Sequence, residues 1–107
     1  MTAKDYRDAN ERMMTEITDK LSSISFRIIE HEYDYACFGS WYFVCNNTDK
    51  EFRIVFDGKD SILCVQVKTE KDVVLKTGEI WKDLVSVRSK EPSVESVIKL
   101  FESAHEA

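Results

Sequence analysis

Glycine, proline and histidine are scarce in this chain, and their scarcity removes several classes of function. With three glycines and one proline, the sequence contains no Gly-rich phosphate loop, no dinucleotide-binding fingerprint and no G-x-S-x-G motif. No segment has the composition of a linker, and nothing repeats. At 107 residues and 43% hydrophobic content, the sequence predicts a single globular domain, residues 1–107, with one core.

Long apolar runs are missing as well. The longest stretch without a charge, residues 35–48, is too short to cross a bilayer. Residues 1–21 are charged throughout, which argues against a cleaved signal peptide. The chain has an odd number of cysteines, Cys37, Cys45 and Cys64, and they lack C-x-x-C spacing. This is expected of free thiols in a reducing compartment. We therefore expect a cytoplasmic protein without a membrane segment.

Positive charge is the minority sign. Fifteen basic residues against 20 acidic ones give a net charge of −5. This balance disfavours nucleic acid and anionic membranes as partners, and it favours a basic protein. No pattern in the sequence indicates a cofactor.

Three apolar runs at residues 41–45, 52–56 and 62–67 are the strongest structural signal. They are rich in β-branched and aromatic residues, which suit a half-buried pleated sheet. The segments between them, residues 46–50 and 57–60, are rich in Asn, Asp and Gly and therefore predict hairpin turns. The three runs thus predict an antiparallel meander.

The lengths of the turns predict the pairing of the strands. In the first hairpin we expect Cys45 opposite Phe52, and in the second Phe56 opposite Ser61. Both registers place the same apolar set on one face, and a slip of one residue would break that face. The predicted core residues of the sheet are Trp41, Phe43, Cys45, Phe52, Ile54, Phe56, Leu63 and Val65.

Helices are predicted at both ends of the chain. Residues 5–21 carry an apolar stripe at helical spacing, made of Tyr6, Ala9, Met13, Ile17 and Leu21. Pro92 and Ser93 predict a second helix start. The stripe that follows it contains Val94, Val97, Ile98, Phe101 and Ala104.

Two further segments complete the predicted fold. Residues 24–33 read as a strand with Phe26 and Ile28 on one side and Arg27, Ile29, His31 and Tyr33 on the other. Residues 70–92 are ambiguous: residues 73–75 predict a strand, whereas residues 80–87 fit a short helix or another strand, and we favour a strand. The predicted class is α+β, with an N-terminal helix, an antiparallel meander of four to six strands and a C-terminal helix, and with both helices on one face of the sheet.

The second face of this sheet is the candidate partner-binding surface. It is half apolar, so we expect it either to bind something or to be covered by residues 73–87. The rigid aromatic Tyr42 suits an interface, and Trp81 is a further aromatic candidate, whereas Trp41 is expected in the core. The predicted binding residues combine this face with a separate acidic segment at residues 30–34, and they are Glu30, Glu32, Asp34, Tyr42, Val44, Arg53, Val55, Ile62 and Gln66.

Residues 30–34 also allow other interpretations. Three carboxylates and a histidine could hold a metal, but on a strand His31 points away from the acidic side chains, so we expect no metal site. An acidic docking patch and a solvated strand edge both remain open. Cys37 is the thiol worth testing for reactivity, because it lies near His31 in sequence.

A nuclease-like alternative rests on three other side chains. Gln66-Val67-Lys68 is similar to the (D/E)-x-K triplet of a common metal-dependent nuclease core, with Gln in place of the acid. In the predicted register, Glu51 lies opposite Gln66, where the first acid of that core belongs. The alternative interpretation of Glu51, Gln66 and Lys68 is that they are ordinary polar residues of the second face.

Across its whole length, the chain resembles the small acidic immunity proteins that bacteria carry against toxin domains, including those of contact-dependent growth inhibition. The resemblance lies in size, charge and the layout of helix, meander and helix, and it carries over no individual residue. It implies a non-catalytic protein that blocks a toxin domain, often a nuclease. The competing hypotheses are the metal-dependent hydrolase and a structural domain that self-associates through its outer sheet face, so we expect a monomer or a weak homodimer.

Overall fold

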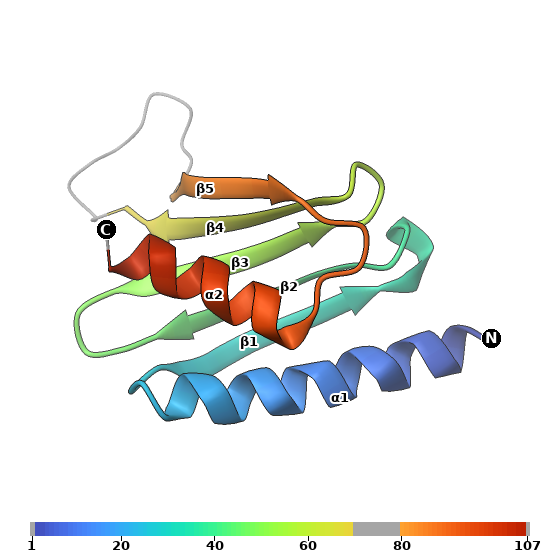
Figure 1. Cartoon of the computed structure of the whole chain (residues 1–107), viewed down its shortest axis with the longest axis horizontal. Coiled ribbons are helices and arrows are strands. Elements are labelled where there is room, and N and C mark those ends of the chain that lie inside the picture. Colours follow the sequence, from blue (N-terminus) through green and yellow to red (C-terminus); the bar gives the residue numbers. More distant parts are fainter. Residues whose placement is uncertain (1, 70–79, 107) are drawn as a thin grey trace.

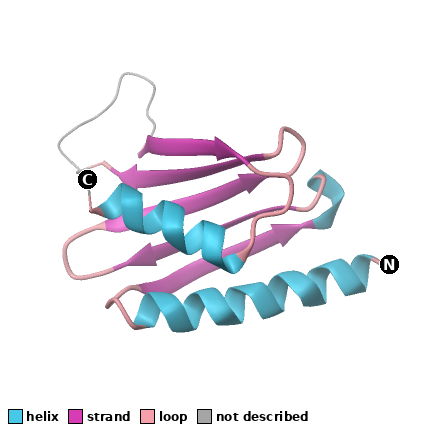
Figure 2. Cartoon of the chain, in the orientation of Figure 1, coloured by secondary structure: helices cyan, strands magenta, loops and turns pink. Residues whose placement is uncertain are grey.

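Within the residues that the structure describes, five strands, two α-helices and one short 3-10 helix are formed (Figure 1). The computed structural model describes residues 2–69 and 80–106. The strands form one antiparallel sheet in the order β1-β2-β3-β4-β5, so neighbours in sequence are neighbours in space (Figure 2). The elements are α1 (Ala3–Ser22), β1 (Arg27–Asp34), the short 3-10 helix η1 (Tyr35–Cys37), β2 (Ser40–Asn46), β3 (Glu51–Asp57), β4 (Ile62–Lys68), β5 (Trp81–Arg88) and α2 (Val94–His105).

The predicted α+β class is therefore confirmed, and residues 81–88 are a strand rather than a helix. The strand predicted at residues 73–75 lies outside the described residues. Among the helices of the described ranges, none combines the length and the apolar character that crossing a bilayer requires.

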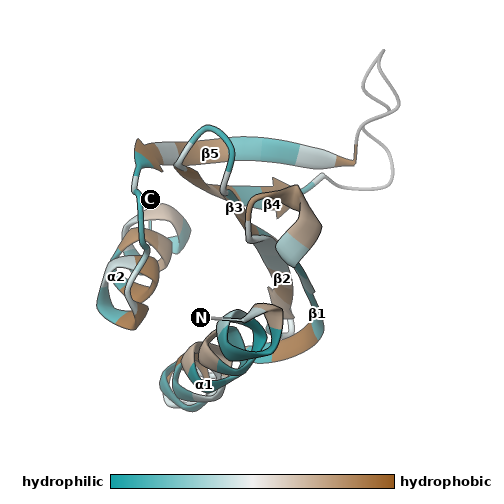
Figure 3. Cartoon of the chain, turned by 90° about the vertical axis from the view of Figure 1, so that its right-hand side faces the viewer, coloured by the Kyte–Doolittle hydropathy of each residue, from teal (hydrophilic) through white to brown (hydrophobic). Residues whose placement is uncertain are grey.

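The core lies between the two helices and one face of the sheet, which we call the inner face. All eight predicted core residues of the sheet are buried. Ile17, Leu21 and Phe101 from the helices are fully buried in the same cluster. Figure 3 shows α1 and α2 on one side of the sheet. Neither α1 nor α2 lies on the opposite side, which we call the outer face.

The first hairpin has the predicted register, with Cys45 opposite Phe52 and Trp41 opposite Phe56. The second register was predicted wrongly by two residues, because Phe56 lies opposite Leu63 instead of Ser61. Ser61 adopts a left-handed conformation (φ 55°) and belongs to the turn, so pairing begins at Asp57 and Ile62. A shift of two residues preserves the side-chain alternation, so the residues predicted on the core face are correct despite the error in register.

Strand β1 contains a β-bulge that the sequence pattern did not indicate. Ile28 pairs with Cys45, whereas Glu30 pairs with Val44, so Ile29 is the extra residue and is 46% exposed. The bulge shifts the alternation by one. The prediction that His31 and Tyr33 lie on the side opposite Ile28 was therefore wrong, because all three point to the inner face.

Helix α1 begins with a capping box between Thr2 and Asp5, and α2 begins with one between Ser93 and Ser96. The buried stripe of α1 is rotated from the predicted one: Met14 rather than Met13 is buried, and Tyr6 is 43% exposed. The Tyr6 ring lies 5.6 Å from that of Tyr35, beyond the end of the core.

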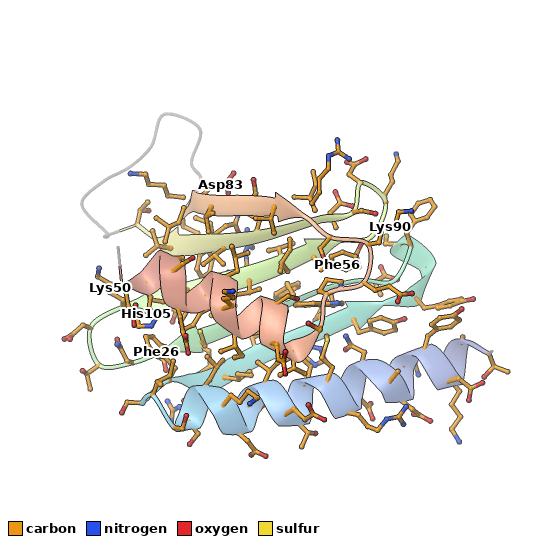
Figure 4. All side chains as sticks on the ribbon, in the orientation of Figure 1. Phe26, Lys50, Phe56, Asp83, Lys90 and His105 are labelled. Atoms are coloured by element: carbon orange, nitrogen blue, oxygen red, sulfur yellow. The ribbon has the colours of Figure 1, made fainter. Side chains whose placement is uncertain are left out.

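The C-terminal turn of α2 is packed by aromatic rings. The His105 ring lies 4.9 Å from that of Phe101 and 5.1 Å from that of Phe26 (Figure 4). Phe26 comes from the turn before β1, so these rings connect the first strand to the last helix. This cluster holds the last turn of α2 against the sheet.

Candidate functional site

All nine predicted binding residues lie on the outer face of the sheet. Strand pairing aligns them in rows that cross the sheet. One row runs Glu30, Val44, Arg53, Gln66 and Asp83, and the next runs Glu32, Tyr42, Val55, Cys64 and Ser86. Asp34 and Ile62 lie further along the same face, opposite Ser40 and Asp57.

The centre of the outer face is apolar. Val44 is only 5% exposed and yet is not part of the main core cluster, so its burial comes from the outer face itself. Tyr42 and Val55 lie directly opposite each other on neighbouring strands, and both are half-buried. These three residues form the apolar patch of this face.

An acidic edge borders this patch along β1. Glu30, Glu32 and Asp34 are exposed, and among residues 2–69 and 80–106 none of them is in an ion pair. A hydrogen bond from the Tyr42 hydroxyl to Glu30 is the main cause that raises the pKa of Tyr42, with partial burial and the Glu32 charge adding to it. Glu30 and Glu32 thus lie beside Val44 and Tyr42 at the border of the apolar patch.

Arg53 lies in a polar chain on the other side of the patch. Its Nε donates to Gln66 Oε1 at 2.7 Å, and Gln66 Nε2 donates to Asp83 Oδ1 at 2.7 Å. The Arg53 guanidinium also lies 4.8 Å from the centre of the Trp81 ring. These contacts hold Arg53 in place.

A cavity of about 500 Å³ opens where the loop between β1 and β2 meets the turn between β3 and β4. We call it the Phe38 pocket. Its floor includes Tyr42 and Val55 from the apolar patch. The residues that line it are Glu32, Asp34, Cys37, Phe38, Ser40, Trp41, Tyr42, Val55, Phe56, Asp57 and Lys59.

Part of this pocket was not predicted from the sequence. Cys37, Phe38, Asp57 and Lys59 come from loops and turns, and their meeting depends on how the two connections pack together. The available signal was Gly58, whose missing side chain allows the Phe38 backbone to approach.

The nuclease-like arrangement is not formed as predicted. Glu51 was expected opposite Gln66, but the register of β3 and β4 places it opposite Lys68, and the two form an ion pair at 3.1 Å. Gln66 lies opposite Arg53 and accepts its hydrogen bond. The predicted pairing of Glu51 with Gln66 was therefore wrong, and Gln66 is held between Arg53 and Asp83.

His31 and the carboxylates of the predicted metal alternative lie on opposite faces of the sheet. His31 lies on the inner face, and its Nε2 bonds Asn10 Oδ1 at 2.9 Å, while the carboxylates of residues 30–34 lie on the outer face. Burial lowers the pKa of His31, and the charges of Glu11 and Glu32 only partly offset this. Within the part of the chain that the structure describes, no three His, Cys, Asp or Glu residues are grouped to hold a metal.

The surroundings of all three thiols raise their pKa values. A hydrogen bond to Asp34, and then the charges of Asp34 and Asp57, raise the pKa of the exposed Cys37. Burial raises the pKa of Cys45 to about 12 and that of Cys64 to about 11. Since the thiolate is the reactive form, this environment suppresses nucleophilic chemistry.

No protein-family model, no curated protein and no solved structure matches the chain.

Proposed function

We propose that this chain is a non-catalytic module that binds a basic protein partner through its outer face, as an immunity protein that neutralises a toxin domain. The observation that carries this proposal is the convergence of two features on one face. The acidic edge of Glu30, Glu32 and Asp34 borders the apolar patch of Tyr42, Val44 and Val55, and neither α1 nor α2 covers them.

The size of the outer face is suited to this role. Five strands spaced about 4.8 Å apart and about seven residues long give roughly 24 by 23 Å, or about 550 Å² in projection. A stable interface buries about 800 Å² of accessible surface on each partner. The face, together with the loops at its ends, therefore provides the area that such a complex needs.

The two features contribute differently to binding. The acidic edge and the net charge of −5 attract a basic partner and speed encounter, an effect that falls with ionic strength. The apolar patch and its aromatic ring slow dissociation once the surfaces meet. Blocking a toxin domain in this way needs no chemistry by the chain itself.

The proposal predicts that the gene directly upstream of this chain's gene encodes a toxin domain, and the test uses that domain. Co-expression of the chain is expected to protect cells from that domain, and the purified proteins are expected to form a stable complex. A triple variant, Glu30→Gln, Glu32→Gln and Asp34→Asn, is expected to weaken the complex at 50 mM salt and to lose most of its salt dependence.

The matched control neutralises three exposed carboxylates elsewhere, with Glu16→Gln, Asp19→Asn and Glu91→Gln. It changes the net charge equally and is expected to leave affinity within about threefold of the parent. Equal weakening by both triple variants would mean that only net charge matters, and would contradict an outer-face site. A chain that neither binds nor protects would contradict the immunity function.

A further inference from the structure

The Phe38 pocket is a concave feature of the outer face, and the acidic edge and the apolar patch meet there. Its volume of about 500 Å³ lies within the range of about 300–1,000 Å³ that ligand pockets occupy. Tyr42 and Val55 come from the patch, and Glu32 and Asp34 come from the edge. Phe38 is 69% exposed, so its ring faces solvent at the mouth instead of packing in the core.

The walls of this pocket are held by specific contacts. The Gly58 backbone N–H donates to Ser40 Oγ at 2.9 Å and holds the turn against the start of β2. A Cβ on Gly58 would overlap the Phe38 carbonyl oxygen, so the two connections touch backbone to backbone. Phe38 and Gly39 both adopt positive φ values, of 58° and 72°, which turn the chain at this contact.

Two of the carboxylates are oriented by the turns that they close. One oxygen of Asp34 accepts from the backbone N–H groups of Ala36 and Cys37, at 3.0 and 3.3 Å. One oxygen of Asp57 accepts from those of Lys59 and Asp60, also at 3.0 and 3.3 Å. In each carboxylate, the second oxygen takes no part in these bonds.

The charge at the mouth is negative on balance. Glu32, Asp34 and Asp57 line the pocket, and Lys59 is the cation among the lining residues. The raised pKa of Cys37, to which Asp34 and Asp57 both contribute, reflects the same negative field at the wall. An apolar, aromatic pocket with a carboxylate rim is complementary to an organic cation.

We propose that the Phe38 pocket receives one arginine side chain of the basic partner, with its guanidinium on the Phe38 or Tyr42 ring and its N–H groups directed to Glu32, Asp34 and Asp57. This inference rests on the proposed function, because it takes the arginine from that partner. Arginine suits the pocket better than lysine: its guanidinium is planar, weakly hydrated and able to stack, whereas an ammonium is a strongly hydrated point charge.

The test titrates the full-length chain with the peptide acetyl-Gly-Arg-Gly-amide and follows its amide resonances by NMR. Saturable shifts are expected at Cys37, Phe38 and Tyr42, with a dissociation constant in the millimolar range. The matched peptide with citrulline is nearly isosteric and uncharged, and it is expected to produce much smaller shifts. Equal shifts with the two peptides would contradict recognition of a cation.

Variants separate the pocket from general attraction to an acidic protein. Glu32→Gln is expected to weaken peptide binding about two- to fivefold, as loss of one exposed charge pair predicts, and Glu16→Gln on α1 is expected to leave it unchanged. Phe38→Ala is expected to reduce binding while most resonances of the core stay in place, because this ring is largely exposed. Equal effects of the two charge variants would overturn the assignment.

The peptide and toxin experiments together distinguish failure of the pocket assignment from failure of the proposed function. If the arginine peptide binds at Phe38 but the chain neither binds nor neutralises the toxin domain, the pocket stands and the proposed function fails. If the toxin complex forms and Phe38→Ala changes neither its affinity nor peptide binding, the function stands and the pocket assignment fails.

Discussion

Alanine at Gly58 tests the backbone contact that forms the Phe38 pocket. The substitution would place a Cβ against the Phe38 carbonyl group and within 3.3 Å of Ser40 N. Because these neighbours are backbone atoms, no side-chain rotation relieves the overlap. The loop must move away, and the hydrogen bond from the Gly58 N–H to Ser40 Oγ is then weakened.

The expected loss of stability has two parts. Overpacking costs about 1–3 kcal/mol, and the lost hydrogen bond about 1 kcal/mol, which together give about 2–4 kcal/mol. With an unfolding entropy of about 2.1 cal/mol/K per residue, each kcal/mol lowers Tm by about 4 °C in a chain of this length. Gly58→Ala is therefore expected to lower Tm by about 8–16 °C.

Gly39 provides the matched control. It has a φ of +72°, but a Cβ there would meet only Tyr33 Oη at 3.7 Å, an ordinary contact. Gly39→Ala is thus expected to cost about 1 kcal/mol, from the left-handed backbone alone. Urea unfolding followed by tryptophan fluorescence measures both variants. A cost below about 0.5 kcal/mol for Gly58→Ala, or a larger cost at Gly39, would refute this account of the contact.

Three further outcomes are expected. The free energy of unfolding falls as pH drops below about 6.5, because the lowered pKa of His31 makes protonation favour the unfolded chain. Urea midpoints from pH 8 to 5 measure this, and the same dependence of stability on pH in His31→Gln would contradict it. Phe101→Ala costs about 3–5 kcal/mol in urea, because this ring is fully buried, and a cost under about 1 kcal/mol would place it outside the core. Iodoacetamide is expected to modify Cys37 in the native protein and Cys45 only after unfolding, because Cys45 is buried and has a pKa of about 12. Mass spectrometry measures modification at each site, and equal rates at the two cysteines would contradict the burial of Cys45.

The inner face of the meander was predictable because its alternation has a period of two. Trp41, Phe43 and Cys45 on one strand meet Phe52, Ile54 and Phe56 on the next, and a single turn length makes every pair match. The same regularity concealed the error in the second hairpin, since a shift of two residues preserves which side chains point inward. Ser61 belongs to the turn and has a left-handed conformation, which a serine does not indicate in the sequence.

The bulge at Ile29 and the pocket at Phe38 could not be predicted from the periodicity of apolar residues. A bulge breaks the alternation at one position, and the identical neighbours Ile28 and Ile29 give no indication of which one points inward. The pocket forms between the loop before β2 and the turn after β3. These two segments are joined by the hydrogen bond between Gly58 and Ser40, which are 18 residues apart in the sequence. The regular alternation predicted for residues 24–33 placed Glu30, Glu32 and Asp34 on the side of Ile28, and the bulge moves them to the opposite, outer face.

The most direct test of the outer-face assignment is an NMR map of the labelled chain with and without the toxin domain. Methyl resonances of Val44 and Val55 and amide resonances along β1 are expected to shift or broaden, whereas those of the solvent side of α1 remain in place. Perturbations confined to α1 and α2, with Val44 and Val55 unchanged, would contradict the central claim that the chain binds its partner through the outer face of the sheet.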